Sequence, residues 1–183
     1  PYLSRGLGDV YKRQVEMEFH PQANQVEFVF TPSTLNEKQL ADSQKLAEQV
    51  AHGLEHVGLL AVELFLSDGG GLLVNEVAPR PHNSGHLTIE AATTSQFEQH
   101  LRTILGLPFG DCQFFHNAIM VNLAGAKDFQ GPVLYEGMDD LLNVSGLHVH
   151  LYGKAETRPM RKMGHITLVG SDIDLLLSLI HIS

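Results

Sequence analysis

The chain has 183 residues, with 12 lysines and arginines against 21 aspartates and glutamates, so its formal net charge is −9 at pH 7. This acidity disfavours binding to nucleic acid or to an anionic membrane surface, because both require excess positive charge. No apolar run approaches the roughly 20 residues that span a bilayer. The single cysteine, Cys112, excludes a disulfide framework and a cysteine-based zinc site. We therefore expect a folded protein of a reducing compartment, with one large or two small domains.

The two ends of the chain differ from the remainder. Residues 1–14 show neither helical nor strand periodicity, and residues 177–183 interrupt a helix that the sequence predicts from Ser171 onward. Both strings resemble translated sequencing-adapter sequence, so we interpret them as non-native extensions; native flexible ends are the alternative. The remaining residues, 15–176, hold nine basic and 20 acidic side chains, which makes the body of the protein more acidic than the whole chain.

The first predicted elements are two strands and a helix. Alternating apolar residues predict short strands at 16–19 and 26–30. Thr34 and Glu37 match a capping box, in which a hydroxyl and a carboxylate satisfy the first N–H groups of a helix. Apolar residues at helical spacing follow, and Gly58 is the expected stop signal.

A hairpin is predicted next, because two apolar runs, LLAVELFL at 59–66 and LLVNEV at 72–77, flank a glycine-rich turn. After a polar loop, Ser95 and Glu98 form a second capping box and predict a short helix. Three further strands are predicted at 118–125, 146–153 and 164–170. This mixed order with hairpins favours an α+β fold with antiparallel sheet, and a domain boundary is expected near residues 106–117.

Two carboxylates stand out in the predicted hairpin. Glu63 and Glu76 each lie in the middle of an apolar strand, where a carboxylate is costly unless a positive group meets it. If Gly69 and Gly70 form a two-residue turn, the register places both glutamates on one face, with Cβ atoms about 4.5–5.5 Å apart. A turn one residue longer, without a bulge, places them on opposite faces.

Facing carboxylates repel by roughly 4 kcal/mol at about 4 Å and an effective dielectric near 20. A shared proton or a divalent cation would remove this repulsion. The oxygen-only ligand set, with Asn75 beside it, favours Mg²⁺, which substrate phosphates commonly help to coordinate. The pair therefore indicates a phosphate-bearing cofactor; a solvent-exposed polar edge of the hairpin is the alternative.

The polar loop PRPHNSGH follows the second glutamate directly. Prolines on both sides restrict the backbone around Arg80, and arginine is the usual partner of a carboxylate or phosphate. His82 can exchange a proton near neutral pH. Asn83 and Ser84 offer neutral hydrogen bonds, and Gly85 allows close approach of the backbone to a ligand. These residue types indicate a ligand-binding loop; an ordinary surface loop is the alternative.

A basic cluster contrasts with the acidity of the rest of the chain. Lys154, Arg158, Arg161 and Lys162 fall within nine residues, opposed only by Glu156. Such a local excess of positive charge between two strands favours an anion, for example a phosphate monoester on a small substrate. A solvated charged turn is the alternative.

The motifs together resemble a known family. The run from Ala61 to Asp111 and the run LYGKAETRPMRKMGHITLVG are similar to the ATP-grasp family of 5-(carboxyamino)imidazole ribonucleotide synthases of purine biosynthesis. HNSGH and the K…RPxRKMGH block are the most specific segments. Formate-dependent glycinamide ribonucleotide transformylase and biotin carboxylase share the two glutamates, but their following loops differ. The resemblance covers about residues 15–176.

The resemblance implies a fold, a reaction and a setting. Residues 15–110 correspond to the second half of an ATP-grasp domain, an antiparallel sheet with helices, and residues 111–176 to a small β-rich C-terminal domain. The family carboxylates 5-aminoimidazole ribonucleotide with ATP and bicarbonate, through carboxyphosphate, in the cytoplasm, and a full-length protein is expected to be a homodimer. Because the lysines and adenine-binding strand of the first half of the lid are missing here, we expect no turnover by this chain alone.

The resemblance also implies roles for individual residues. Glu63 and Glu76 correspond to ligands of the Mg²⁺ that bridges the phosphates of ATP, and Asn75 assists at the nucleotide site. Arg80 would hold bicarbonate or carboxyphosphate, and His82 would move a proton or orient the intermediate. The expected substrate-binding residues are Asn83, Ser84, Gly85, Lys154, Arg158 and Arg161. Another ATP-grasp carboxylate–amine ligase, or a non-catalytic phosphate- or metal-binding module, remains an alternative.

Overall fold

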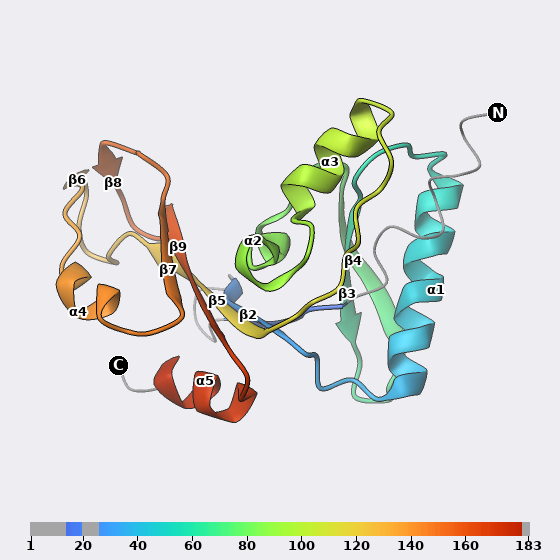
Figure 1. Cartoon of the computed structure of the whole chain (residues 1–183), viewed down its shortest axis with the longest axis horizontal. Helices are drawn as coiled ribbons and strands as arrows, with labels where there is room; N and C mark the ends of the chain where they lie inside the picture. The colour runs from blue at the N-terminus through green and yellow to red at the C-terminus, as the bar shows by residue number, and fades with distance from the viewer. Residues whose placement is uncertain (1–13, 20–25, 181–183) are drawn as a thin grey trace. The chain divides into compact units, whose positions relative to one another are not determined.

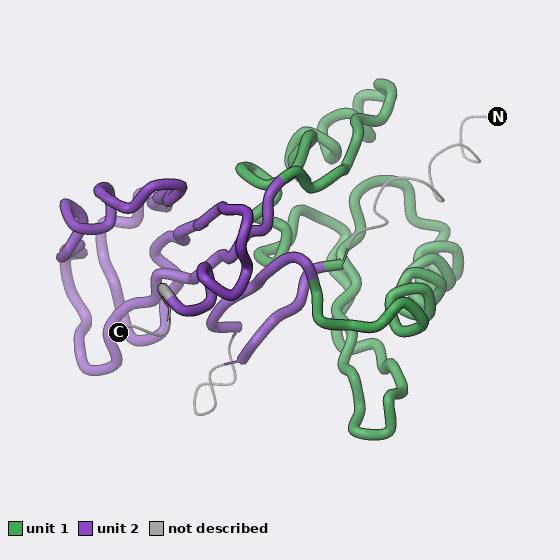
Figure 2. The backbone as a smooth tube through the Cα atoms, turned by 60° about the horizontal axis from the view of Figure 1, so that its bottom comes forward, with its two compact units in different colours: residues 1–14, 33–115 green, residues 15–32, 116–183 purple. Residues whose placement is uncertain are grey.

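The computed structural model describes residues 14–19 and 26–180, which belong to two compact units (Figure 1; Figure 2). Unit 1 comprises residues 33–115 together with the start of the chain up to Gln14, and unit 2 comprises residues 15–32 and 116–183. Each unit has its own antiparallel sheet, so the predicted α+β fold class is confirmed. In the part of the chain that is described, no helix is long and apolar enough to cross a membrane.

In unit 1, a long helix lies against a two-stranded hairpin, and short helices follow (Figure 1). The elements are α1 (Glu37–Gly53), β3 (Ala61–Leu66), β4 (Leu72–Ala78), the 3₁₀ helix η1 (Asn83–Gly85), α2 (Thr88–Ala91) and α3 (Gln96–Ile104). Gln14 Nε2 donates hydrogen bonds to the carbonyl of Leu40 and the hydroxyl of Ser43 in α1. The last residue of the predicted 1–14 extension is therefore part of this unit, and the other thirteen lie outside the described residues.

The start of α1 differs from the prediction. The N-cap is Asn36, whose side-chain oxygen accepts a hydrogen bond from the N–H of Gln39 at 2.9 Å, and the Gln39 side chain accepts from the N–H of Asn36 at 3.0 Å. The predicted capping box began at Thr34 and was wrong by two residues, because Asn and Gln form the same reciprocal pair. The helix also ends at Gly53, earlier than the stop expected at Gly58.

The β3–β4 hairpin contains a β-bulge that decides the position of both glutamates. Glu63 pairs with Glu76, whereas the next residue of β3, Leu64, pairs with Val74. Asn75 is therefore the extra residue of β4, and it pairs with no residue of β3. Strand pairing consequently shifts by one residue at the level of the two carboxylates.

The turn of this hairpin is longer than predicted. Residues 67–71 connect the strands and hydrogen-bond among themselves, so the expected two-residue glycine turn is wrong. By itself the longer loop would pair Glu63 with Asn75 and place Glu76 on the opposite face. The bulge adds one residue to β4 and restores the register, so the predicted pairing of Glu63 with Glu76 is confirmed.

The elements of unit 2 are β1 (Glu16–Phe19), β2 (Val26–Thr31), β5 (Asn117–Ala124), β6 (Gly131–Pro132), α4 (Met138–Leu142), β7 (Leu147–Leu151), β8 (Glu156–Thr157), β9 (Lys162–Gly170) and α5 (Ile173–Ile180). Five of these strands form an antiparallel sheet in the order β1-β2-β5-β9-β7, and β6 pairs with β8. Helix α5 packs against the sheet and contributes to a core made of Phe28, Phe30, Ile119, Leu168 and Leu176.

Two features of unit 2 differ from the sequence-based expectation. Strands β1 and β2 were grouped with the helix and hairpin of residues 33–110, but β2 pairs with β5, which follows them in the chain (Figure 2). Helix α5 continues to Ile180, so the interruption predicted after Leu176 is not observed. The non-native origin of residues 177–183 and the predicted family domain boundaries stay predictions.

Candidate functional site

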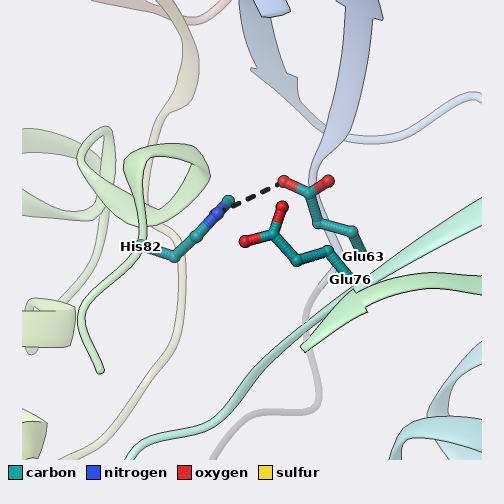
Figure 3. A group of neighbouring side chains, drawn as sticks. All are labelled: Glu63, Glu76 and His82. Carbon is teal, nitrogen blue, oxygen red and sulfur yellow. Dashed lines mark ion pairs between the residues drawn. The ribbon is translucent and has the colours of Figure 1, made fainter. Parts of the chain in front are cut away.

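Three side chains that can bind a metal ion meet in unit 1: Glu63 and Glu76 from the hairpin and His82 from the loop after β4 (Figure 3). One donor atom of each residue lies within 4.8 Å of the other two. His82 Nε2 is 3.3 Å from a carboxylate oxygen of Glu63, and these side chains are only 12% and 10% exposed. The site therefore combines two carboxylates with one partly buried imidazole.

The bulge residue also contributes to the site. Asn75 Nδ2 donates a hydrogen bond to Oε2 of Glu63 at 3.2 Å, while Oε1 of the same carboxylate faces His82. Each oxygen of Glu63 thus has a different neighbour, and the carboxylate is held in one orientation. The sequence-based placement of Asn75 beside the glutamates agrees with this geometry.

The contacts of Nδ1 with Ser84 set the orientation of the His82 ring. Nδ1 lies 2.9 Å from the hydroxyl of Ser84 and accepts from the backbone N–H of Ser84 at 3.4 Å. Both contacts are made by Nδ1, so Nε2, on the other side of the ring, is directed at Glu63. Ser84, at the centre of η1, therefore orients the imidazole toward the carboxylate pair.

The donor set fits a hard divalent cation. Carboxylate oxygens are the ligands that Mg²⁺ prefers, and two carboxylates with water and substrate phosphates are its usual protein environment. The facing arrangement brings two negative charges together, which a cation would compensate. His82 is an additional donor that the sequence had not assigned to the metal, because its ring meets Glu63 through the fold of the loop.

Two buried polar residues behind the loop were not predicted. Gln96, at the start of α3, and Thr88, in α2, are 3% and 2% exposed. Gln96 hydrogen-bonds to both backbone groups of His82. The sequence pattern did not reveal Gln96, because α3 inverts the usual amphipathic arrangement: its glutamines are buried, and the exposed apolar residues in and just after this helix include Phe97, Leu101, Ile104 and Leu105.

Arg80 lies beside the site but does not enter the cluster. Its side chain is exposed, and its guanidinium donates to the carbonyl oxygen of Pro81 at 3.0 Å. Asn83, Ser84 and Gly85 form η1 directly after His82. Contacts of Arg80 and Asn83 with an anionic ligand stay predictions.

The predicted basic cluster belongs to unit 2. Lys154 Nζ lies 5.4 Å from the centroid of the Tyr152 ring and donates to a backbone carbonyl at the start of β9. Arg161 donates from Nη1 to the carbonyl oxygen of Glu156 at 2.8 Å, so it does not engage the carboxylate of that residue. Arg158 is exposed, and its carbonyl accepts from the N–H of Arg161 to close a turn.

The six residues expected around one cleft divide between the units. Four of them, Glu63, Glu76, Arg80 and His82, belong to unit 1. Of these four, Glu63, Glu76 and His82 meet in one cluster. Lys154 and Arg161 belong to unit 2, where they flank one short loop. A common cleft of all six stays a prediction.

Cys112 is expected to be unreactive. The thiol is half-buried, and burial is the main cause that raises its pKa above the usual range; Asp111 adds to this, while a hydrogen bond from Gln99 opposes it. A raised pKa leaves less thiolate at neutral pH. Iodoacetamide should therefore alkylate the folded chain more slowly than free cysteine at neutral pH, with the rate rising only in strongly alkaline buffer. Mass spectrometry against time measures this, and equal rates at neutral pH would contradict it.

Two family models match the chain. An ATP-grasp domain matches residues 8–97, which contain the hairpin and the His82 loop. A phosphoribosylaminoimidazole carboxylase C-terminal domain matches residues 118–178, which contain the basic cluster. The predicted family resemblance is therefore confirmed in both parts of the chain.

Curated relatives carry a consistent name. The chain is 51% identical over 133 residues to the N5-carboxyaminoimidazole ribonucleotide synthase of Mycobacterium bovis, covering 72% of this chain and 31% of that protein. The synthase of Bacillus subtilis is 49% identical over 124 residues, covering 68% of this chain and 31% of that protein. The chain thus spans about a third of the length of these relatives.

Solved structures of the same enzyme share the fold. The synthetase of Thermotoga maritima has a TM-score of 0.80 and 41% identity, covering 90% of this chain and 50% of that one. The synthase of Aspergillus clavatus, solved with ADP and 5-aminoimidazole ribonucleotide, has a TM-score of 0.81 and 30% identity, covering 92% of this chain and 44% of that one. The chain belongs to the N5-carboxyaminoimidazole ribonucleotide synthase family of ATP-grasp ligases and contains part of such an enzyme.

Proposed function

We propose that the enzyme of which this chain is part carboxylates 5-aminoimidazole ribonucleotide to N5-carboxyaminoimidazole ribonucleotide, consuming ATP and bicarbonate and releasing ADP and phosphate. Carboxyphosphate is the intermediate: a bicarbonate oxygen attacks the γ-phosphorus, ADP leaves, and the substrate amine then takes the carboxyl carbon and releases phosphate. The observation that carries this proposal is the Glu63–Glu76–His82 cluster, within a chain whose relatives bear this name. A Mg²⁺ ion held there would neutralise phosphate charge.

The residues of unit 1 supply positioning and charge. Glu63 and Glu76 would hold Mg²⁺, which would neutralise the charge of the ATP phosphates, and Asn75 keeps Glu63 oriented through its amide. The guanidinium of Arg80, being exposed, is available to bind bicarbonate or carboxyphosphate through a forked hydrogen bond. His82 would orient the intermediate or accept a proton, within a pocket shaped by Asn83, Ser84 and Gly85.

The residues of unit 2 would bind the ribonucleotide. Lys154, Arg158 and Arg161 concentrate positive charge in a chain of net charge −9, so a phosphate monoester is the ligand that this surface favours. We further propose a cytoplasmic location and a homodimeric full-length enzyme. A related ligase acting on glycinamide ribonucleotide is not favoured, because the curated relatives of this chain are named otherwise.

Calorimetry on the 183-residue chain tests this proposal. We expect heat of binding with Mg²⁺–ATP and with 5-aminoimidazole ribonucleotide, no binding of glycinamide ribonucleotide, and no catalytic turnover by the chain alone. The variant Arg161→Ala should weaken binding of the ribonucleotide and leave Mg²⁺–ATP unchanged. A non-catalytic metal-binding module would bind neither nucleotide, and that outcome would overturn the proposal. Steady ATP hydrolysis that depends on the imidazole substrate would show that the chain is active by itself.

A further inference from the structure

Tyr152, the residue that directly follows β7, contacts both a buried histidine and the ammonium of Lys154. Its hydroxyl lies 3.0 Å from Nδ1 of His165, and the two rings are tilted by 52° with their centroids 5.7 Å apart. Nζ of Lys154 lies over the ring of Tyr152, 5.4 Å from its centroid. One aromatic ring therefore connects the sheet of unit 2 with a charge of the basic cluster.

The position of the Tyr152 ring is set by the sheet. The backbone N–H of Tyr152 donates to the carbonyl of Met163 in β9 at 2.9 Å. His165, which contacts the hydroxyl, is 3% exposed, and its ring stacks on that of His150 at a centroid distance of 4.4 Å and an angle of 12°. These two histidines are also paired in the β7–β9 ladder. Tyr152 is thus attached to the sheet at its backbone and at its hydroxyl.

Lys154 is held by two neutral partners. Its ammonium donates to the backbone carbonyl of Lys162, and it lies over the ring of Tyr152, whose face attracts a cation but carries no net charge. Among residues 14–19 and 26–180, no carboxylate oxygen lies within ion-pair distance of Lys154. An ammonium has three N–H donors, so Lys154 keeps its full charge and at least one donor for an anion.

This arrangement favours anion binding. A lysine that moves freely loses much rotamer freedom when it binds a ligand, which weakens the affinity. The half-buried side chain of Lys154 is already restrained by the carbonyl and the ring. A carboxylate could restrain it equally well, but it would compete with the anion for the same charge. The tyrosine ring does not compete.

We propose that Tyr152 is a positioning residue for the phosphate of the ribonucleotide: its ring, anchored by His165, holds the ammonium of Lys154 in the orientation that binds the phosphate. The inference rests on the ribonucleotide site of the proposed function. Tyr152 acts through Lys154 and does not itself bind the ligand. Removing the ring therefore weakens binding although every charge of the basic cluster is retained.

Calorimetric titration of the whole 183-residue chain with 5-aminoimidazole ribonucleotide tests the proposal. Tyr152→Leu removes the ring and should weaken binding about fivefold to tenfold. Tyr152→Phe retains the ring face and loses only the hydroxyl contact with His165, so it should recover most of the affinity. Tyr135→Leu is the matched control, because Tyr135 is also half-buried and its hydroxyl donates to the carbonyl of Met163 at 3.3 Å. This control should lower the melting temperature comparably and leave the affinity unchanged.

Nuclear magnetic resonance of the chain with isotope-labelled lysine tests the contact even if Tyr152→Leu does not fold. Protons above an aromatic face resonate upfield, so the ε-methylene signals of Lys154 should lie upfield of those of the other lysines. Lys154→Arg assigns these signals by their loss, and the upfield position should persist in Tyr152→Phe. Signals of Lys154 that coincide with those of the other lysines would overturn the proposal.

A double-mutant cycle decides whether Tyr152 acts through Lys154. In a Lys154→Met background, Tyr152→Leu should cause no further loss of ribonucleotide affinity. Additive losses, or an unchanged affinity in folded Tyr152→Leu, would overturn the role of Tyr152 and leave the ribonucleotide site intact. If the unaltered chain does not bind the ribonucleotide at all, the site of the proposed function fails together with the positioning role, so the two failures are distinguishable.

Discussion

Glu76→Gln is expected to lower the affinity of the chain for Mn²⁺ or Mg²⁺ roughly 100-fold or more, while the metal-free protein becomes slightly more stable. Glu76 faces Glu63 across the hairpin, and the two carboxylates and His82 form one cluster of donors. The amide removes one charged ligand, and direct ligands contribute more to affinity than the groups that orient them. The same change relieves repulsion between like charges, by less than about 1 kcal/mol because Glu76 is exposed and screened.

Opposite effects on binding and stability make this prediction specific. In the unaltered chain, Mn²⁺ should raise the melting temperature, because a ligand that binds only the folded state stabilises it. Glu76→Gln should melt at a similar or higher temperature without metal and show no increase with metal. Glu48→Gln, on the exposed face of α1, removes the same charge far along the chain from the cluster and should retain the metal-dependent increase. A retained increase in Glu76→Gln would exclude this residue as a ligand.

Gly125→Ala is expected to destabilise unit 2 and to weaken phosphate binding together. A Cβ atom at position 125 would lie 2.2 Å from the carbonyl oxygen of Arg158 and 2.2 Å from the hydroxyl of Thr157. Gly125 also donates to the carbonyl of Arg161 and accepts from the N–H of Met160, so it is bonded to both sides of the turn that carries the two arginines. The backbone oxygen cannot give way without moving that turn.

The expected cost is about 1–3 kcal/mol, as for other overpacked sites. For a chain of this size, that corresponds to a lower melting temperature by several degrees. Calorimetry should also show weaker binding of 5-aminoimidazole ribonucleotide, while Mn²⁺ affinity in unit 1 stays unchanged. Gly53→Ala is the control, because a Cβ atom there meets nothing within 4 Å at the end of α1. If Gly125→Ala changes the melting temperature and the ribonucleotide affinity no more than Gly53→Ala does, the close approach of the two segments is required for neither stability nor binding.

Local patterns in the sequence determined most of the strands and the pair of carboxylates. Apolar alternation located β1 and β2, two apolar runs around a glycine-rich turn located the strands of the hairpin, and the motif around His82 identified the loop that completes the cluster. These features depend on residues close together in the chain, whose side chains alternate between faces or repeat at helical spacing. The pairing of Glu63 with Glu76 was inferred correctly from a turn that is longer in the structure, because the bulge at Asn75 compensates for the difference.

Tertiary structure decided the remainder. Strand β2 pairs with β5 because its ladder hydrogen bonds and the burial of Phe28 and Phe30 are satisfied by strands distant in the sequence. The contact of Gln96 with the His82 loop has a similar reason: a buried amide needs hydrogen-bond partners, and the backbone of His82, 14 residues earlier in the chain, supplies them. Periodicity identifies which residues favour a strand or a helix, whereas the packing of distant segments selects which polar groups meet.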